Sequence, residues 1–121
     1  MDYSRDMVEQ IVIGTLLNDL GEDKFFAKNR MALRKELFKD RKNAFIFGII
    51  QRMHEDGIEV TSPSDVFAYT NKNNIQYGNV SNFVTYMCEL SQRYYAFGDF
   101  SKYVRELVDA YVKEKRYGTT R

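Results

Sequence analysis

Few side chains in this chain are suited to nucleophilic chemistry, because it has a single histidine, His54, and a single cysteine, Cys88. A nucleophile and base pair would have to join these two residues. Cys88 falls in a segment with the apolar pattern of a buried helix, whereas His54 falls in the polar last turn of another predicted helix. One cysteine also excludes an internal disulfide and a multi-cysteine zinc site, and it indicates a reducing compartment, which we expect to be the cytoplasm. We therefore predict no catalytic residue, no metal and no cofactor.

Phosphate-binding and metal-binding motifs are also missing from the sequence. The seven glycines never form a Gly-rich run that ends in Gly-Lys-Ser/Thr, so there is no Walker-type phosphate loop. The acidic pairs Glu22-Asp23 and Glu55-Asp56 are adjacent, and adjacent side chains on a helix diverge instead of meeting at a metal. By itself the chain is expected neither to hydrolyse ATP nor to be an enzyme.

Charge is distributed unevenly, although the net charge is only +1. Residues 1–23 hold one Arg and six acids, for a net of −5, whereas residues 24–42 hold eight bases and two acids, for a net of +6. Three phenylalanines interleave with these bases, namely Phe25, Phe26 and Phe38. One interpretation is a single-strand nucleic-acid contact, with phosphates bound by Lys35, Lys39 and Lys42. The other is that the phenylalanines face the core and the cations are solvated or pair with the acidic segment.

Aromatic residues gather toward the C-terminus of the chain. The candidates for a protein interface are Tyr94, Tyr95, Phe97, Tyr103 and Tyr111. The first three crowd a predicted connector, and the last two are eight residues apart, which places them two turns apart on one face of a helix. Tyrosine is enriched in interfaces because its ring buries apolar area while its hydroxyl tolerates water. Burial in the core is the alternative for Tyr103 and Tyr111.

The elements that must position these residues are predicted to be helices, because apolar residues recur mainly at spacings of three and four. The fold class is therefore all-α. The expected helices cover residues 6–19, one broken helix or two short ones within 22–38, and then 40–57, 63–69, 80–91 and 99–118. At 121 residues we expect one domain, with a helical head of about four helices over residues 6–75 and a helical hairpin over residues 79–117.

Local signals mark several helix ends. Asp6 is predicted to cap the first helix, with Glu9 completing a capping box. Asp40 is predicted to cap the third segment, which Gly57 ends. In the next helix Ser62 caps, Pro63 takes the first helical position and Asp65 closes the box. No apolar run approaches the roughly 18 residues needed to cross a bilayer, and the acidic start does not fit a secretory signal, so we expect no membrane segment.

Once these elements are placed, the chain resembles the N-terminal domain of the bacterial replicative DNA helicase of the DnaB type. The segment Glu9-Gln10-Ile11-Val12-Ile13-Gly14-Thr15-Leu16-Leu17 is similar to that domain's Glu-Gln-x-Val-Leu-Gly-x-Leu-Leu. Further likenesses are Phe38 followed by Ile46-Phe47, the turn Glu55-Asp56-Gly57-Ile58-Glu59-Val60, the segment Tyr86-Met87-Cys88-Glu89-Leu90, and Tyr103. The family's Ile-Asp-x-x-Thr-Leu segment is replaced here by Val60-Thr61-Ser62-Pro63-Ser64-Asp65. The likeness runs over about residues 7–116.

The resemblance implies a non-catalytic assembly domain acting in DNA replication, as part of the primosome. In that family the domain pairs through a helical hairpin, supports the hexamer collar, and presents a surface to the primase or helicase loader. The implied partners are thus a second copy of the chain, in a dimer or larger assembly, and a primase or loader, with weak DNA contact at most. The chain would be an excised domain or a stand-alone relative. The helicase-binding domain of a primase is an alternative with a similar pattern.

Overall fold

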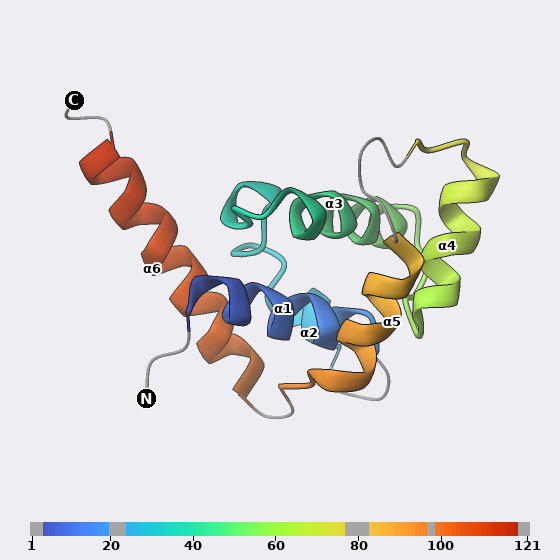
Figure 1. Ribbon diagram of the computed structural model, residues 1–121, viewed down its shortest axis with the longest axis horizontal. Coiled ribbons are helices and arrows are strands. Elements are labelled where there is room, and N and C mark those ends of the chain that lie inside the picture. Colours follow the sequence, from blue (N-terminus) through green and yellow to red (C-terminus); the bar gives the residue numbers. More distant parts are fainter. Residues whose placement is uncertain (1–3, 20–23, 77–82, 97–98, 119–121) are drawn as a thin grey trace.

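The computed structural model describes residues 4–19, 24–76, 83–96 and 99–118 of the chain. Within these residues every regular element is helical, which confirms the all-α prediction (Figure 1). The elements in chain order are α1 (Arg5–Leu16), α2 (Phe25–Lys28), the short 3₁₀ helix η1 (Lys35–Leu37), α3 (Arg41–Glu55), α4 (Pro63–Lys72), α5 (Phe83–Arg93) and α6 (Phe100–Gly118). The broken segment before α3 thus forms two short helices.

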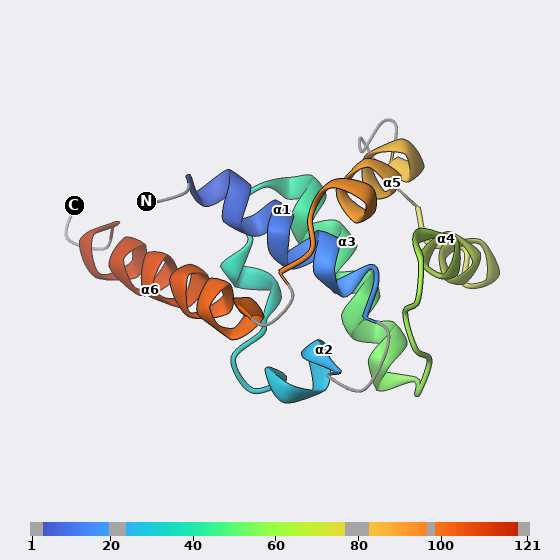
Figure 2. The same ribbon diagram turned by 90° about the horizontal axis from the view of Figure 1, so that it is seen from below.

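The first helix, α1, is the centre of the fold. It packs against α2, α3, α5 and α6, as two perpendicular views show (Figures 1 and 2). Every residue from Ile11 to Leu17 is buried, and Val12, Ile13 and Leu16 have no exposed surface. A helix that is apolar on most sides must be surrounded by other elements. The apolar stripe of this helix predicts one buried face, whereas the structure buries the helix on most sides.

The hairpin predicted for residues 79–117 is not the arrangement observed. The main packing partner of both α5 and α6 is α1, and the two helices diverge from the loop that joins them (Figures 1 and 2). Residues 94–96 of that loop are held to α1, because the Ala96 N–H donates to Thr15 Oγ1 at 2.9 Å. The chain therefore wraps around α1 instead of folding back on itself. The predicted start of the hairpin, residues 79–82, lies outside the described residues.

The start of α1 differs from the predicted cap. Ser4, not Asp6, occupies the cap position, and its Oγ accepts from the Met7 N–H at 3.2 Å. The predicted capping-box residue, Glu9, is fully buried. Its carboxylate accepts hydrogen bonds from the segment that leads into α3, at the Lys39 N–H (2.8 Å) and the Asp40 N–H (3.3 Å). A pattern of local spacing cannot reveal a partner thirty residues away.

A second acidic residue of the N-terminal segment holds the start of α2 in the same way. Asp19 is buried, and its two carboxylate oxygens accept from the Phe25 N–H (2.8 Å) and the Phe26 N–H (3.0 Å). These are free N–H groups of a helix N-terminus, which a carboxylate stabilises. The acidic and basic segments therefore meet, but mainly through backbone N–H groups of the basic one.

The ends of α3 follow the prediction. The Asp40 carboxylate accepts from the Lys42 N–H (2.8 Å) and the Asn43 N–H (3.1 Å), which satisfies two N–H groups of the first turn. At the other end Gly57 has a φ of +77°, a conformation that glycine adopts without strain.

The start of α4 agrees with the prediction in position and differs in bonding. Pro63 is the first helical residue, but the Ser62 side chain makes no capping hydrogen bond. Asp65 instead accepts from the N–H (2.8 Å) and the hydroxyl (2.6 Å) of Thr61. These hydrogen bonds hold the pKa of Asp65 below its ordinary value, and the bond from the Thr61 hydroxyl contributes most.

Candidate docking site

Three of the five predicted interface residues meet in one open hollow of about 360 Å³. Tyr94 and Tyr95, which follow α5, and Tyr103 of α6 line it together with Met7 and Ile11 of α1. All three tyrosines are half-buried and pack against the core on one side. One side of each tyrosine thus contacts the core while the residue also lines an open surface, and a role of these residues in a protein interface stays a prediction.

The wall of this hollow is positioned by close contact between α1 and the end of α5. A Cβ added to Gly14 would lie 2.6 Å from the Leu90 carbonyl oxygen and 2.8 Å from that of Tyr94, so only glycine fits here. Asn18 Nδ2 donates to the Ser91 carbonyl at 2.8 Å and fastens the same end of α5. Such a fixed backbone presents tyrosine rings in set positions, which lowers the entropy lost on binding.

A buried aromatic ring packs against Tyr95, one of the tyrosines that line the hollow. The ring of Phe25 contacts Tyr95 edge-on, with centroids 5.9 Å apart, and lies 5.1 Å from the ring of Phe100 at the start of α6. Arg93 and Asp99 also line the hollow and bring one charge of each sign to it. Aromatic rings with charged groups at their edge are typical of a protein interface, in which an apolar core is surrounded by a polar rim.

Of the two remaining candidates, only Tyr111 lies among the described residues, and it is not part of the lining of this hollow. Tyr111 lies two turns beyond Tyr103 on α6, packs partly against the core, and has the Lys115 amino group 5.7 Å from its ring centroid. Phe97 lies outside the described residues. Sequence reasoning missed Met7 and Ile11 as lining residues, although their spacing of four on α1 places them on one face.

The basic stretch does not carry the aromatic half of a nucleic-acid site. Its three phenylalanines are buried, with exposed fractions of 6% for Phe25, 4% for Phe26 and 5% for Phe38. They are therefore not available to stack on bases, and the prediction of interleaved stacking rings is wrong. The interpretation that these rings face the core is confirmed.

The three lysines of that hypothesis, Lys35, Lys39 and Lys42, are all exposed. Two of them also have partners within the fold. The Lys39 amino group lies 3.0 Å from Glu114 Oε1 of α6, and the Lys42 amino group lies 4.4 Å from the centroid of the Tyr86 ring. Both cations therefore help to join elements, and their contact with phosphate stays a prediction.

His54 and Cys88 form no site with a visible chemical role. The His54 ring stacks on Phe26 with centroids 4.1 Å apart, and burial lowers its pKa below the ordinary value of 6.5. Cys88 is a half-buried free thiol of α5. In the described part of the chain no group of three or more His, Cys, Asp or Glu side chains is placed to hold a metal. Nor is any described helix both long and apolar enough to span a bilayer.

The described elements form a small fold of helices in which three tyrosines line one open hollow. The family model for the DnaB-like helicase N terminal domain matches residues 3–109. The chain therefore belongs to the DnaB-like helicase N-terminal domain family, as the resemblance of its motifs indicates, and a role in DNA replication follows from that family. Comparison with curated proteins and with solved structures gave no match.

Proposed function

We propose that this chain is a non-catalytic assembly and docking domain of a replicative DNA helicase. In this function copies of the domain associate with one another, into the hexamer collar in the full-length helicase, and the domain presents a surface to a primase or helicase loader. The family match supports the helicase side over the primase-domain alternative. The observation that carries the proposal is the hollow where Tyr94, Tyr95 and Tyr103 meet Met7 and Ile11.

The physical argument is that this surface is built for a protein contact. Rings that are fixed on one side and open on the other bury apolar area on binding and lose little conformational freedom. Tyrosine and methionine are enriched in the cores of protein interfaces, whereas charged side chains such as those beside this hollow are typical of the rim. We assign this hollow to contact between copies, because Tyr103 belongs to α6, which extends away from the rest of the molecule (Figures 1 and 2).

Self-association is tested by sedimentation velocity from low micromolar to near-millimolar concentrations. We expect a reversible dimer or larger assembly for the natural chain and a weaker one for Tyr103→Ala and Tyr94→Ala, with the fold retained in circular dichroism. Phe67→Ala is the matched control, because Phe67 is an exposed aromatic residue on α4 outside the hollow. A strict monomer at every concentration would reject self-association.

Partner docking is tested separately, by calorimetric titration of the chain with the helicase-binding domain of a primase from the same replication system. We expect saturable binding by the natural chain. The Phe67→Ala variant then shows whether α4 belongs to the contact, because binding is unchanged when it does not. No binding in this titration would reject docking to the primase and leave self-association as the proposed role.

A further inference from the structure

The second half of α6 has few buried contacts with the rest of the fold. The residues that α6 contributes to the buried core all lie in its first half, namely Phe100, Val104 and Leu107. Among residues 108–116 no side chain is buried, and Val108 and Tyr111 pack only partly against the core. Apolar packing therefore fixes the first half of α6 and leaves the second half to other contacts.

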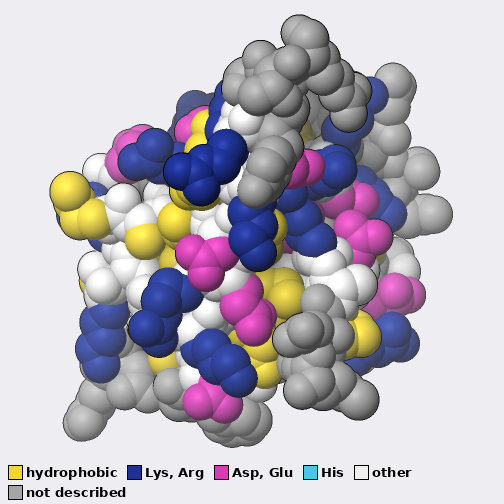
Figure 3. All heavy atoms as spheres, turned by 90° about the vertical axis from the view of Figure 1, so that its left-hand side faces the viewer, with side chains coloured by type: hydrophobic (Ala, Val, Ile, Leu, Met, Phe, Trp, Pro, Cys, Tyr) yellow, Lys and Arg dark blue, Asp and Glu magenta, His cyan; other side chains and the backbone are white. Residues whose placement is uncertain are grey.

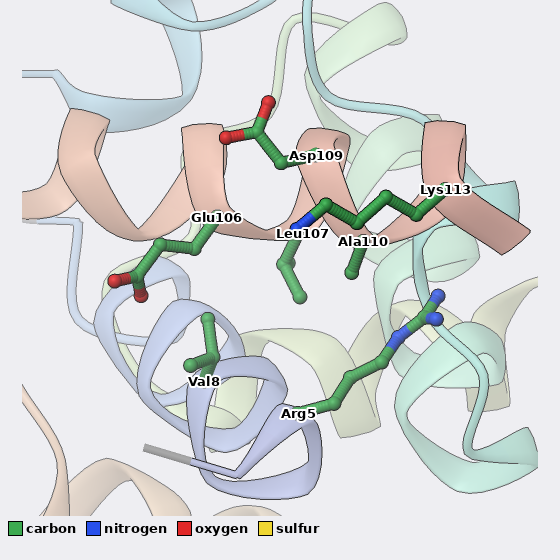
Figure 4. A pocket seen from close by; sticks show the side chains of 7 residues that line it. All are labelled: Arg5, Val8, Glu106, Leu107, Asp109, Ala110 and Lys113. Atoms are coloured by element: carbon green, nitrogen blue, oxygen red, sulfur yellow. The ribbon is translucent and has the colours of Figure 1, made fainter. Parts of the chain in front are cut away.

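A hollow of about 380 Å³ lies between α1 and this second half of α6 (Figure 4). Its apolar residues are Val8 of α1 and Leu107 and Ala110 of α6. The Asp109 carboxylate points away from α1, and the Lys113 side chain runs back along α6 (Figure 4). Apolar groups that face a hollow lose part of the dispersion attraction of close packing. The two helices are thus loosely packed where the second half of α6 passes α1.

Two buried polar atoms at this hollow have no hydrogen-bond partner among the described residues, namely Glu106 Oε2 and Arg5 Nε. Arg5 Nε lies 3.4 Å from Glu9 Oε2 but donates no hydrogen bond to it. Buried polar atoms without hydrogen bonds are costly, and they gain water when the elements that cover them move apart. The position of this part of α6 on α1 is therefore maintained against a cost, which is typical of elements that open locally.

One carboxylate of the second half, that of Glu114, compensates for this cost by binding two cations. Arg5 Nη1 of α1 donates to Glu114 Oε2, and the Lys39 amino group lies 3.0 Å from Glu114 Oε1. Arg5 is itself fixed, because its Nη2 donates to the Leu37 carbonyl at 3.0 Å. Basic and acidic side chains lie close together on the face that includes α6 (Figure 3). Glu114 thus joins the end of α6 to α1 and to the segment that leads into α3.

We propose that Glu114 is an electrostatic latch, which switches the second half of α6 between a docked state on Arg5 and Lys39 and a released state. The side chains of Lys39 and Glu114 are 69% and 44% exposed, so dissolved ions screen the attraction between them. High ionic strength therefore favours the released state, in which the second half leaves α1 and the hollow opens. The buried residues of the first half keep that half in place.

Amide hydrogen exchange, followed by mass spectrometry at low micromolar concentration, tests the latch in the natural chain. We expect the amides of residues 108–116 to exchange about threefold faster or more when the salt concentration rises from about 20 mM to about 500 mM. The amides of residues 100–107 are the internal reference and should respond less, because buried apolar side chains hold this half of the helix.

Glu114→Gln removes the charge and nearly keeps the size of the side chain. Exchange in residues 108–116 should then be fast even at low salt and should no longer respond to salt. Lys39→Gln should release the helix in part, and adding it to Glu114→Gln should have little further effect, because both changes break the same pair. Glu89→Gln on α5 and Lys102→Gln in the first half of α6 remove the same charges at exposed positions and are the matched controls.

Each outcome decides for or against the latch. Faster exchange confined to residues 108–116, together with loss of the salt response in Glu114→Gln, supports it. Equal acceleration in every segment would mean that Glu114 contributes only to global stability, and the latch would then be wrong. Unchanged exchange in Glu114→Gln, or a salt response that persists in this variant, would also overturn it. The latch acts within one copy of the chain, so a failure of the proposed self-association is a separate result.

Discussion

The carboxylate of Glu9 links three helices from inside the core. It accepts from the backbone N–H groups that lead into α3 and from Asn43 Nδ2, at 2.9 Å. Asn43 Oδ1 in turn accepts from the Tyr86 hydroxyl of α5. Burial raises the pKa of Tyr86 to about 12, so its hydroxyl remains a proton donor at neutral pH. The buried hydrogen bonds of Glu9 therefore explain why a carboxylate is needed at the first position of the family motif in this chain.

We expect Glu9→Gln to lower the free energy of unfolding by about 2 kcal/mol or more, because an amide NH₂ group would then face buried donors that need an acceptor. Urea unfolding followed by circular dichroism measures the change. Glu89→Gln makes the same substitution at an exposed site of α5 and should stay within about 0.5 kcal/mol of the natural chain. Equal effects of the two variants would contradict a role for the buried network.

His54 gives the stability a dependence on pH. Burial lowers its pKa in the folded chain below the ordinary 6.5, so the unfolded chain takes up the proton more readily. The stability associated with neutral His54 is complete above pH 6.5 and is lost as the pH falls toward the lowered pKa. Glu59, Asp65 and Glu114, whose pKa values are also lowered, act at lower pH because their ordinary values are 4.5 or less.

We therefore expect the melting temperature of the natural chain to fall as the pH is lowered through 6.5. His54→Phe keeps a ring that can stack on Phe26 but cannot titrate, so its melting temperature should change less over the same range. Thermal unfolding at several pH values on both sides of 6.5 measures the two slopes. Parallel slopes would assign the pH dependence to other groups.

At the scale of elements, the close contact of α1 with α5 depends on Gly14. Gly14→Ala is expected to lower the free energy of unfolding by about 1–3 kcal/mol, because the new methyl group meets two backbone oxygens that cannot turn aside. Gly48→Ala in α3 is the control, since the atom nearest to its Cβ would belong to the flexible Lys35 side chain, at 3.7 Å. That change should raise stability by about 0.5–1 kcal/mol, the usual preference for Ala over Gly within a helix. The two variants are compared by urea unfolding, and a neutral Gly14→Ala would mean that α5 shifts freely.

The ends of two helices could be predicted from the sequence, whereas the packing of the helices could not. The start of α3 and the first residue of α4 were predictable, because Asp40 and Pro63 act within one turn of their own position. The packing of α5 and α6 on α1 was not, because periodicity shows that a helix has an apolar face without showing what covers it. Glu9 looked like a capping residue for the same reason, since its partners lie thirty residues away.

The candidate docking site was predictable in part. Tyrosine chemistry indicated Tyr94, Tyr95 and Tyr103, and the structure brings these three into one hollow. The contribution of Met7 could not be predicted, because it depends on α1 lying between α5 and α6. The buried Glu106 oxygen could not be predicted for a similar reason, since its burial is produced by the fold.

For the molecule as a whole, the basic stretch 24–42 is part of the fold more than a separate binding surface. Its phenylalanines are buried, Lys24 pairs with Glu59 at 2.9 Å, and Lys39 pairs with Glu114. We expect binding to single-stranded oligonucleotides to be weak and to disappear as salt rises, because phosphate contacts without stacking are strongly screened.

Fluorescence anisotropy of a labelled single strand over a salt titration tests this expectation. Changing Lys35, Lys39 and Lys42 together to Gln should alter binding little at physiological salt, where the natural chain already binds weakly. Tight binding by the natural chain at that salt, lost in the triple variant, would restore the nucleic-acid interpretation.

The central position of α1 also bears on how the chain is made. A ribosome synthesises α1 first, yet the groups that cover it come late: Ser91, Ala96 and Glu114 bond to residues 73, 81 and 109 positions earlier. At usual translation speeds the apolar sides of α1 remain without these partners for roughly 5–20 s. Early in synthesis this helix is thus the segment most open to chaperones and to mispairing, and the domain reaches its stable form only when its last helix has emerged.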